Sequence, residues 1–271
     1  MLNVTPDSFS DGGLFLTAER AIEHAMRLLD EGADILDIGG ESTRPGSRTQ
    51  VSAQEEMDRI LPVVEAVLRQ RPDTVISVDT YKAATAQATV HAGAEIVNDV
   101  SGFLWDDAMA ATCASFGCGV ILMHTRGRPK QWRTQPAIPP GEVLPMVARE
   151  LAQRAQAARD AGVERSKIVL DPGLGFGKRL DENYPLLADL HQLHALGYPL
   201  LVGASRKSFL TRSIAEASDS GVHAMLYATL AAHTAAILVG AHLIRVHDVA
   251  AARAASAIAD DIRDAVEGDR A

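Results

Sequence analysis

The sequence is poor in cysteine, with only Cys113 and Cys118 in a chain of 271 residues. Neither lies near a His or a further Cys at the spacing of a zinc site. A chain of this length also buries a substantial core without disulfide staples. The sequence therefore predicts two free, packed thiols in a protein that works in a reducing compartment, the cytoplasm.

A surplus of positive charge is also missing. Lys and Arg number 26 against 35 Asp and Glu, so the formal net charge is −9. Proteins that bind nucleic acid more often present a basic face, so nucleic acid is not an expected partner. Because an acidic surface repels anions at long range, any phosphate site must be a local cluster of Arg, Lys and His.

The chain lacks a pattern typical of membrane targeting or membrane insertion. Residues 1–13 are polar and rich in turn formers, unlike a signal peptide. The most apolar region, residues 224–244, contains His233, His242 and several Ala and Thr. We expect a buried helix followed by a buried strand there, and no association with a membrane.

Short aliphatic runs alternate with longer amphipathic stretches along the whole chain. The expected strands are Met1–Val4, Asp34–Ile38, Thr74–Val78, Glu95–Val97, Val120–Met123, Ile168–Leu170, Leu200–Val202 and His242–Val246. The expected helices cover residues 18–31, 53–70, 82–92, 106–116, 142–162, 182–195, 207–238 and 248–266. This alternation predicts a parallel sheet, and about 250 residues is the usual size of a closed barrel of this kind. We therefore expect one domain over residues 1–271, a single (β/α)8 TIM barrel.

Polar side chains follow these strands, at or just past the point where each strand ends. Among them are Asn3, Glu41, Asp79, Asn98, His124, Asp171, Arg245 and His247. In a closed barrel such ends lie on one face, where these enzymes hold their active sites. The carboxylates of Asp79 and Asp171 and the amide of Asn98 suit the N–H donors of a nitrogen-rich heterocycle. For each residue taken alone, a helix cap or a loop anchor is the alternative interpretation.

Basic side chains at the same ends suit a phosphate. Arg44 lies in the glycine-containing segment 39–46, and Arg is a natural bidentate phosphate donor. Arg245 and His247 alternate after the last strand and so point to the same side. The loops after strands seven and eight are the common phosphate site of this barrel. Segment 171–178 is also glycine-rich, but it lacks the spacing of a nucleotide-binding loop, so no nucleotide is implied.

Together these motifs resemble those of the dihydropteroate synthase family of pterin-binding TIM barrels. The matching segments are LNVTPDSFSDGG (2–13), GGESTRPG (39–46), ISVDT (76–80), IVND (96–99), LDPGLGFGK (170–178), LLVGASRKS (200–208) and IRVHD (244–248). They occur in the family's order, and the set is highly specific although no single segment is decisive. The resemblance implies a transferase of folate biosynthesis, which condenses (7,8-dihydropterin-6-yl)methyl diphosphate with 4-aminobenzoate to give 7,8-dihydropteroate and diphosphate.

The resemblance also implies roles for individual positions. It assigns the pterin to Asp79, Asn98, Met123, Asp171 and Lys207. It assigns the diphosphate to Thr43, Arg44, Arg245 and His247, and the 4-aminobenzoate pocket to Thr43, Pro45, Phe176, Ser205 and Lys207. Arg44, Lys207, Arg245 and His247 would carry catalysis, and Asn3 would help to bind Mg²⁺, the implied cofactor. Mg²⁺ takes oxygen ligands and usually keeps waters and substrate phosphates among them.

The family's reaction is ionisation at the pterin methylene carbon, followed by capture of the cation by the aniline nitrogen. Such chemistry requires preorganised charge around a leaving anion and no covalent nucleophile. The resemblance further implies small-molecule substrates, a homodimer and a target of sulfonamides. The family has further residues before the position of Met1, so either the natural start lies upstream of Met1 or the first strand is truncated. Tyr81 stands where a smaller residue is frequent, and we expect the helix start to tolerate it.

Two other functions fit parts of the pattern. A divergent pterin-binding barrel without synthase activity could dispense with Arg44, Lys207 and Arg245, which are all present here. A methyltetrahydrofolate-dependent methyltransferase domain needs no diphosphate clamp and works with a corrinoid partner. Pterin binding without turnover would favour the first alternative, and methyl transfer to a cobalamin would favour the second.

Overall fold

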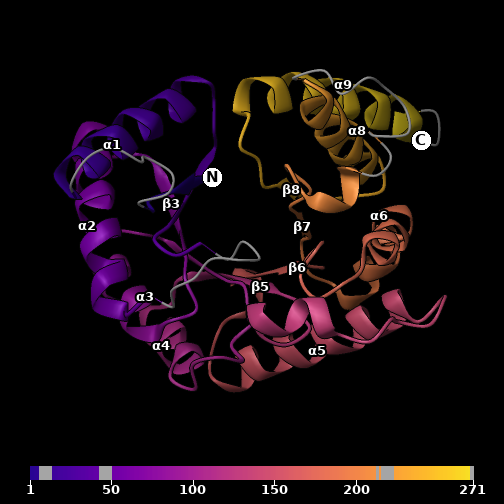
Figure 1. Ribbon diagram of the computed structural model, residues 1–271, viewed down its shortest axis with the longest axis horizontal. Coiled ribbons are helices and arrows are strands. Elements are labelled where there is room, and N and C mark those ends of the chain that lie inside the picture. Colours follow the sequence, from indigo (N-terminus) through magenta and orange to yellow (C-terminus); the bar gives the residue numbers. More distant parts are fainter. Residues whose placement is uncertain (6–13, 43–50, 212–213, 215–222, 269–271) are drawn as a thin grey trace. The chain divides into compact units, whose positions relative to one another are not determined.

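A computed structural model describes residues 1–5, 14–42, 51–211, 214 and 223–268 of the chain (Figure 1). The chain packs as two compact units. The first unit comprises Met1–Met123 and Gln153–Val169, and the second comprises His124–Ala152 and Leu170–Ala271. The expectation of one domain over residues 1–271 stays a prediction.

In the first unit, short strands alternate with helices in chain order (Figure 1). The strands are β1 (Leu2–Asn3), β2 (Ile35–Gly39), β3 (Val75–Asp79), β4 (Ile96–Asp99) and β5 (Gly119–Met123). The helices are α1 (Leu14–Asp30), α2 (Ala53–Gln70), α3 (Ala83–His91) and α4 (Met109–Phe116). Each strand pairs in parallel with the next, and β6 (Ile168–Asp171) continues the sheet. Strand β1 covers two residues.

The strands of the first unit form because their apolar side chains are buried. Strands of a parallel sheet are usually covered on both faces and therefore have near-continuous hydrophobic runs. The side chains that are fully buried in β2, β3 and β4 include Leu36, Ile38, Ile76, Val78 and Val97. Helix α2 contributes Ile60, Val63 and Val67 to the same core. The core therefore lies between this sheet and its helices.

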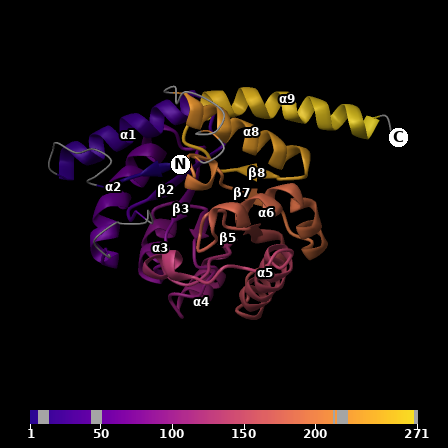
Figure 2. The same ribbon diagram turned by 45° about the vertical axis from the view of Figure 1, so that its right-hand side comes forward.

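The second unit contains the later elements of the alternation. They are α5 (Val143–Asp160, whose last residues belong to the first unit), α6 (Tyr184–Ala188), β7 (Leu201–Val202), α8 (Ala224–Leu238), β8 (Leu243–Ile244) and α9 (Val249–Gly268). Strand β7 pairs in parallel with β8, and Leu170 at the end of β6 bridges to Leu200. Figures 1 and 2 show α8 and α9 side by side. All eight expected strands are therefore confirmed.

Two expected helices differ from those observed. The continuous helix expected over 182–195 is wrong, because α6 is flanked by 3-10 segments at Leu180–Asn183 and Leu190–Leu196. Asp189 leaves helical geometry between them (φ −110°, ψ 22°), and Asp competes for backbone hydrogen bonds inside helices. In the expected helix 207–238, Ser208–Leu210 form a 3-10 turn and α8 begins at Ala224. Residues 212–213 and 215–222 lie outside the described residues.

The structure also bears on three expectations drawn from composition: the state of the two cysteines, membrane insertion, and the apolar stretch 224–244. Cys113 and Cys118 are free and buried, which confirms the packed thiols, and Cys118 Sγ donates to the Cys113 carbonyl at 3.7 Å. Every helix that the structure describes is too short or too polar to cross a membrane. The apolar stretch 224–244 forms α8 and β8, which confirms the expected helix and strand. Their full burial was wrong, because both residues of β8 are partly exposed and α8 buries one side only.

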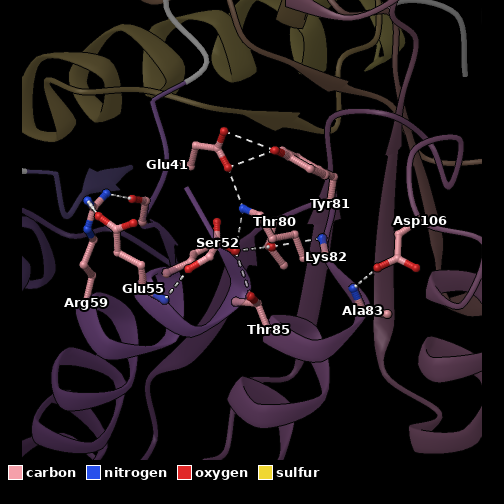
Figure 3. A network of polar contacts seen from close by, with 12 residues as sticks. Glu41, Ser52, Glu55, Arg59, Thr80, Tyr81, Lys82, Ala83, Thr85 and Asp106 are labelled. Carbon is pink, nitrogen blue, oxygen red and sulfur yellow. Dashed lines mark hydrogen bonds and ion pairs between the residues drawn. The ribbon is translucent and has the colours of Figure 1, made fainter. Parts of the chain in front are cut away.

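A buried carboxylate, Glu56 of α2, ties this helix to the end of β3 and the start of α3. Its side chain is 1% exposed, and its Oε2 accepts hydrogen bonds from Thr80 Oγ1 at 2.9 Å and Thr85 Oγ1 at 2.8 Å. Lys82 Nζ lies 3.1 Å from the same oxygen and 2.5 Å from Glu41 Oε2. Figure 3 shows how Glu41, Tyr81 and Lys82 face one another. The three donors satisfy the Glu56 carboxylate, so its burial is tolerated.

We predict that Glu56→Gln lowers the free energy of unfolding by about 1–3 kcal/mol, because it leaves buried donors without their charged acceptor. The neighbouring Glu55 provides a matched control. It is half-exposed, and its Oε1 lies 2.6 Å from Arg59, one helical turn away. Urea denaturation should show Glu55→Gln to be within about 0.5 kcal/mol of the parent protein. Equal effects of the two substitutions would contradict the network.

Candidate active site

The strand register of the first unit gives four predicted site residues a common direction. Partners in adjacent parallel strands point to the same face of a sheet, and so do residues two apart in one strand. The chain of partners runs Asn3, Gly39, Asp79, Asn98 and Ile121, with Met123 two residues further along β5. Asn3, Asp79, Asn98 and Met123 therefore point to one face at the carboxyl end of this sheet.

A second acidic residue on that face, Asp37, was not predicted as a site residue. It is buried and accepts a hydrogen bond from Ser77 Oγ at 2.7 Å. Asn98 Nδ2 lies 3.3 and 3.4 Å from its two carboxylate oxygens. This contact fixes the Asn98 amide with its nitrogen toward Asp37, so its oxygen is directed elsewhere as an acceptor. The signal in the sequence is one charged residue within the apolar strand β2.

Asp99, next to Asn98, is a loop anchor. It is fully buried, and its carboxylate accepts the backbone N–H groups of Ser101 at 2.7 Å and Phe103 at 3.1 Å. Burial raises the pKa of Asp99 to about 6, although these hydrogen bonds oppose the shift. The alternative that we attached to every strand-end residue therefore applies to Asp99.

Glu41 lies two residues before Thr43, the first of three predicted site residues in segment 43–45. Tyr81 Oη donates to its two oxygens at 3.1 and 3.0 Å, and Lys82 pairs with it (Figure 3). Tyr81, which we expected to be tolerated, thus has a defined contact. Its ring also meets Trp105 edge-on with centroids 5.0 Å apart. Thr43, Arg44 and Pro45 lie outside the described residues.

In the second unit, the end of β6 carries the buried carboxylate of Asp171. Its Oδ1 accepts the Gly173 N–H at 2.7 Å. Burial raises the pKa of Asp171, and this hydrogen bond and the positive charges of Lys207, Lys178 and Arg245 oppose the rise. The structure thus brings predicted residues from the ends of β6, β7 and β8 into one electrostatic group.

Lys178, which was not assigned a role, is the most deeply buried of these cations. Its Nζ donates to the carbonyl of Gly173 at 2.7 Å and to that of His124 at 3.4 Å. Burial lowers the pKa of Lys178 to about 7, and Asp171 opposes the shift. The loop that carries it packs closely, because a Cβ at Gly177 would lie 2.8 Å from the Arg126 carbonyl. Only glycine fits at this point, where φ is +73°.

Phe176 and Lys207, both assigned to 4-aminobenzoate by resemblance, are in direct contact. Lys207 Nζ lies 3.8 Å from the centroid of the Phe176 ring, a cation–π arrangement. The Trp132 ring meets Phe176 edge-on at 5.0 Å, and its indole N–H donates to Thr125 Oγ1 at 3.2 Å. Trp132 was not predicted; it lies in the 3-10 segment Pro129–Thr134, which is too short to give a periodic signal.

The loops after β7 and β8 are joined by two contacts. Ser205 Oγ accepts the His247 backbone N–H at 3.3 Å and lies 2.9 Å from His247 Nδ1. The hydroxyl hydrogen can then go to Nδ1, which leaves Nε2 as the protonated, donating nitrogen. Arg206 and Asp248 form a bidentate pair at 2.7 and 3.2 Å. The second unit therefore brings Ser205, Lys207, Arg245 and His247 to neighbouring loops.

The charged residues at the ends of β6, β7 and β8 could bind an anion next to a heterocycle that carries N–H donors. Lys207, Arg245 and His247 are donors for phosphate oxygens, and Asp171 is an acceptor for ring N–H groups. Within the described parts of the chain, no group of three His, Cys, Asp or Glu residues could hold a metal ion.

Two buried histidines of the second unit make stability depend on pH. Burial lowers the pKa of His124 to about 4, aided by the charge of Lys178 and opposed by Glu150, and burial lowers the pKa of His233 to about 4. An unfolded histidine titrates near 6.5. Between these values the unfolded chain binds protons that the native protein does not, so stability falls as pH falls from about 6.5 to about 4.

We predict that His124→Gln, which keeps a donor for Glu150, reduces this pH slope. One proton corresponds to about 1.4 kcal/mol per pH unit, so the slope should fall by about 1 kcal/mol per unit. Denaturation series at several pH values measure it. The exposed His191 is the control, since His191→Gln should leave the slope unchanged. An unchanged slope in His124→Gln would contradict neutral burial of His124.

The sequence matches a family model and curated relatives over most of its length. The model of the pterin binding enzyme family matches residues 1–247. A dihydropteroate synthase of Streptococcus pyogenes serotype M6 is 42% identical over 251 residues, which cover 93% of this chain and 90% of the relative. A dihydropteroate synthase of Escherichia coli K12 is 43% identical over 249 residues, which cover 92% and 85%.

Solved structures of the same kind are also similar. A Clostridium difficile dihydropteroate synthase crystallised with pteroic acid has a TM-score of 0.87 at 39% identity, covering 96% of this chain and 94% of that one. The Xanthomonas albilineans enzyme with 4-aminobenzoic acid has a TM-score of 0.87 at 40% identity, covering 97% and 91%. A Yersinia pestis dihydropteroate synthase in a sulfonamide complex has a TM-score of 0.86 at 42% identity, covering 97% and 92%. The fold class is thus the (β/α)8 barrel that the sequence predicts. The chain belongs to the family of pterin-binding enzymes, and its place in that family is with the dihydropteroate synthases.

Proposed function

We propose that this protein condenses (7,8-dihydropterin-6-yl)methyl diphosphate with 4-aminobenzoate, releasing diphosphate and 7,8-dihydropteroate, and that its predicted site residues carry the reaction. The observation that supports this most directly is the buried Asp171 carboxylate with the charges of Lys178, Lys207 and Arg245 around it. A carboxylate suits the donor edge of a pterin, and cations suit the diphosphate that leaves. The same elements would serve both parts of one substrate.

The pterin would be held by acceptors and by one apolar side chain. By family resemblance, we assign its N–H donors to Asp171, Asp79 and Asn98. Support for Asn98 comes from its contact with Asp37, which fixes the direction of its amide. Met123 would pack against the ring, and Lys207 would contact an acceptor of it. An ordered amide and a buried carboxylate lose little freedom on binding, which favours affinity.

The diphosphate would be stabilised by donors that strengthen as the methylene–oxygen bond breaks. We assign this role to Arg245 and His247, with Thr43 and Arg44 by family resemblance. The contacts of Ser205 with His247 support a protonated Nε2 that donates to the anion. The bond to the leaving oxygen breaks with both its electrons, and the lone pair of the 4-aminobenzoate nitrogen then forms the new bond to carbon. The nitrogen, now positively charged, returns to neutrality by losing one of its protons to water. Preorganised donors of this kind supply the largest single term in many enzymes.

The 4-aminobenzoate would lie against Phe176 and Lys207, with Ser205, Thr43 and Pro45 completing its pocket. The 3.8 Å separation of Lys207 Nζ and the Phe176 ring supports a surface that combines an aromatic face with a cation for the carboxylate. A related Yersinia pestis enzyme is solved with a sulfonamide drug. We propose that sulfonamides compete for the same pocket here, so inhibition should be relieved by added 4-aminobenzoate.

The proposed cofactor is Mg²⁺, with Asn3 as its protein ligand. Asn3 fits the ion's preference for oxygen, and the common direction of Asn3, Asp79 and Asn98 supports its inclusion. When bound, Mg²⁺ would neutralise charge on the diphosphate. Removal of divalent cations with a chelator should therefore slow turnover, and full activity without them would contradict this assignment.

The test of the reaction is release of diphosphate from purified protein, both substrates and Mg²⁺. Arg245→Ala should lower kcat/KM by a factor that corresponds to roughly 2–4 kcal/mol, because a charge-assisted contact to the leaving group is lost. Arg245→Lys should retain more activity, and Arg159→Ala, an exposed site on α5, should retain nearly all. Pterin binding without turnover would instead favour a pterin-binding module, and methyl transfer to a cobalamin would favour a methyltransferase.

We also propose that the protein is a homodimer that works in the cytoplasm. Support for the dimer comes from large apolar side chains that are exposed on α8 and α9. Tyr227 is 64% exposed and Ile258 is 59% exposed, and Leu238 and Ile262 of the same two helices are also exposed. Exposed apolar groups of this kind often mark interfaces, and symmetric dimers are the commonest oligomers. Support for the cytoplasm comes from the free Cys113 and Cys118. Recovery of the protein from a secreted fraction would contradict that location.

Light scattering should give twice the chain mass of 28.9 kDa for the parent protein. The pair Ile258→Glu and Ile262→Glu should give the single-chain mass, because a buried charge at the interface would be unpaired. Leu104→Glu is the matched control, since Leu104 is 50% exposed in the first unit. A monomeric parent protein, or dimers that survive both glutamates, would refute the assignment.

A further inference from the structure

The turn after β7 carries two residues of the proposed site and leaves the sheet immediately. Strand β7 ends at Val202, and Gly203–Lys207 follow. Ala204 is fully buried, so its backbone N–H cannot rely on water. A buried N–H without an acceptor costs about as much as a lost hydrogen bond. The turn therefore needs acceptors from outside its own strand.

Helix α8 supplies these acceptors from two side chains. His233 Nε2 accepts the Ala204 N–H at 3.1 Å, and Thr229 Oγ1 accepts the Arg206 N–H at 3.1 Å. The two side chains lie one helical turn apart, on the same face of α8, and both are buried. The Lys207 N–H closes the turn on the Ala204 carbonyl at 3.2 Å.

The backbone between these contacts is held in an unfavourable conformation. Arg206 has φ +56°, in the left-handed region that residues other than glycine seldom adopt. Such a conformation persists only where the surrounding contacts determine it, and it is most common at functional sites. The two acceptors on α8 bind the backbone N–H groups of Ala204 and Arg206, and these residues come directly before and after Ser205.

His233 itself is chemically costly at this position. Because Nε2 accepts a hydrogen bond, the proton is on Nδ1, and Nδ1 has no partner among the described residues. An orphaned buried donor is destabilising, so an apolar side chain would be the cheaper choice for a core helix. What the histidine provides is an acceptor for Ala204. Burial, which lowers the pKa of His233 to about 4, keeps that nitrogen unprotonated at neutral pH.

We propose that Thr229 and His233 of α8 are positioning residues, which hold the 203–207 turn so that Ser205 meets His247 and Lys207 meets Phe176. This inference rests on the proposed function of Ser205 and Lys207. Neither Thr229 nor His233 touches substrate; each acts through one backbone N–H. Substitutions that keep the acceptor should therefore preserve the site, and substitutions of similar size without it should not.

The experiment pairs each loss of the acceptor with a conservative variant. Thr229→Val and His233→Leu remove the acceptor, whereas Thr229→Ser and His233→Gln keep an oxygen that can replace it. Thr234→Val makes the Thr-to-Val change elsewhere on α8. We expect the first two to lower kcat/KM for 4-aminobenzoate by about tenfold or more, and the other three to stay within about threefold of the parent protein. A KM that rises with little change in melting temperature would separate positioning from general stability.

A second readout does not depend on turnover. Amide hydrogen exchange of Arg206 should accelerate by about tenfold in Thr229→Val and stay slow in Thr229→Ser, and Ala204 should respond in the same way to His233→Leu and His233→Gln. Imidazole ¹⁵N shifts should show His233 protonated on Nδ1 alone. If the parent protein released no diphosphate, the proposed function would be wrong, but the exchange rates and ¹⁵N shifts would still test whether Thr229 and His233 hold the 203–207 turn. Unchanged exchange in Thr229→Val and His233→Leu, or kcat/KM retained in both, would overturn the inference.

Discussion

The burial of a carboxylate, Asp171, is the constraint on which the candidate site depends. A buried charge is costly unless it is paired or hydrogen-bonded. Here the Gly173 N–H and the charges of Lys178, Lys207 and Arg245 offset the burial that raises the pKa of Asp171. These groups come from the loops after β6, β7 and β8. A ligand with N–H donors would satisfy the acid further, and an anion would satisfy the cations, as the proposed binding of a pterin diphosphate requires.

The same constraint on buried polar groups explains residues far from any substrate. In the first unit, Glu56 is tolerated because Thr80, Thr85 and Lys82 all donate to it. In the second unit, a buried backbone N–H rather than a carboxylate needs a partner, and α8 provides it. In the scaffold and in the site, buried donors and acceptors are therefore paired with specific groups elsewhere in the chain.

Much of this arrangement could be predicted from the sequence. Aliphatic runs identified every strand, and polar residues at the strand ends pointed to Asp79 and Asn98, which are register partners in the first unit. Their grouping with Asp171 stays a prediction. The sequence could not show that Asn98 contacts Asp37 or that Ala204 contacts His233, because such pairs are distant in the chain and neither member has a local pattern. The sequence also did not reveal the 3-10 segments on either side of α6, because hydrophobic periodicity does not separate short 3-10 segments from an α-helix. The roles assigned to individual site residues came from family resemblance and remain predictions, with Thr43, Arg44 and Pro45 outside the described residues.

The most direct test of the account is the affinity of the protein for dihydropterin diphosphate with and without the Asp171 charge. Calorimetric titration of the parent protein and of Asp171→Asn, at matched pH and Mg²⁺, measures it. The account predicts a dissociation constant at least about tenfold higher in the variant, because one charged hydrogen bond to the ring is lost, with the melting temperature largely retained. An unchanged dissociation constant in a folded variant would contradict the central role given to Asp171.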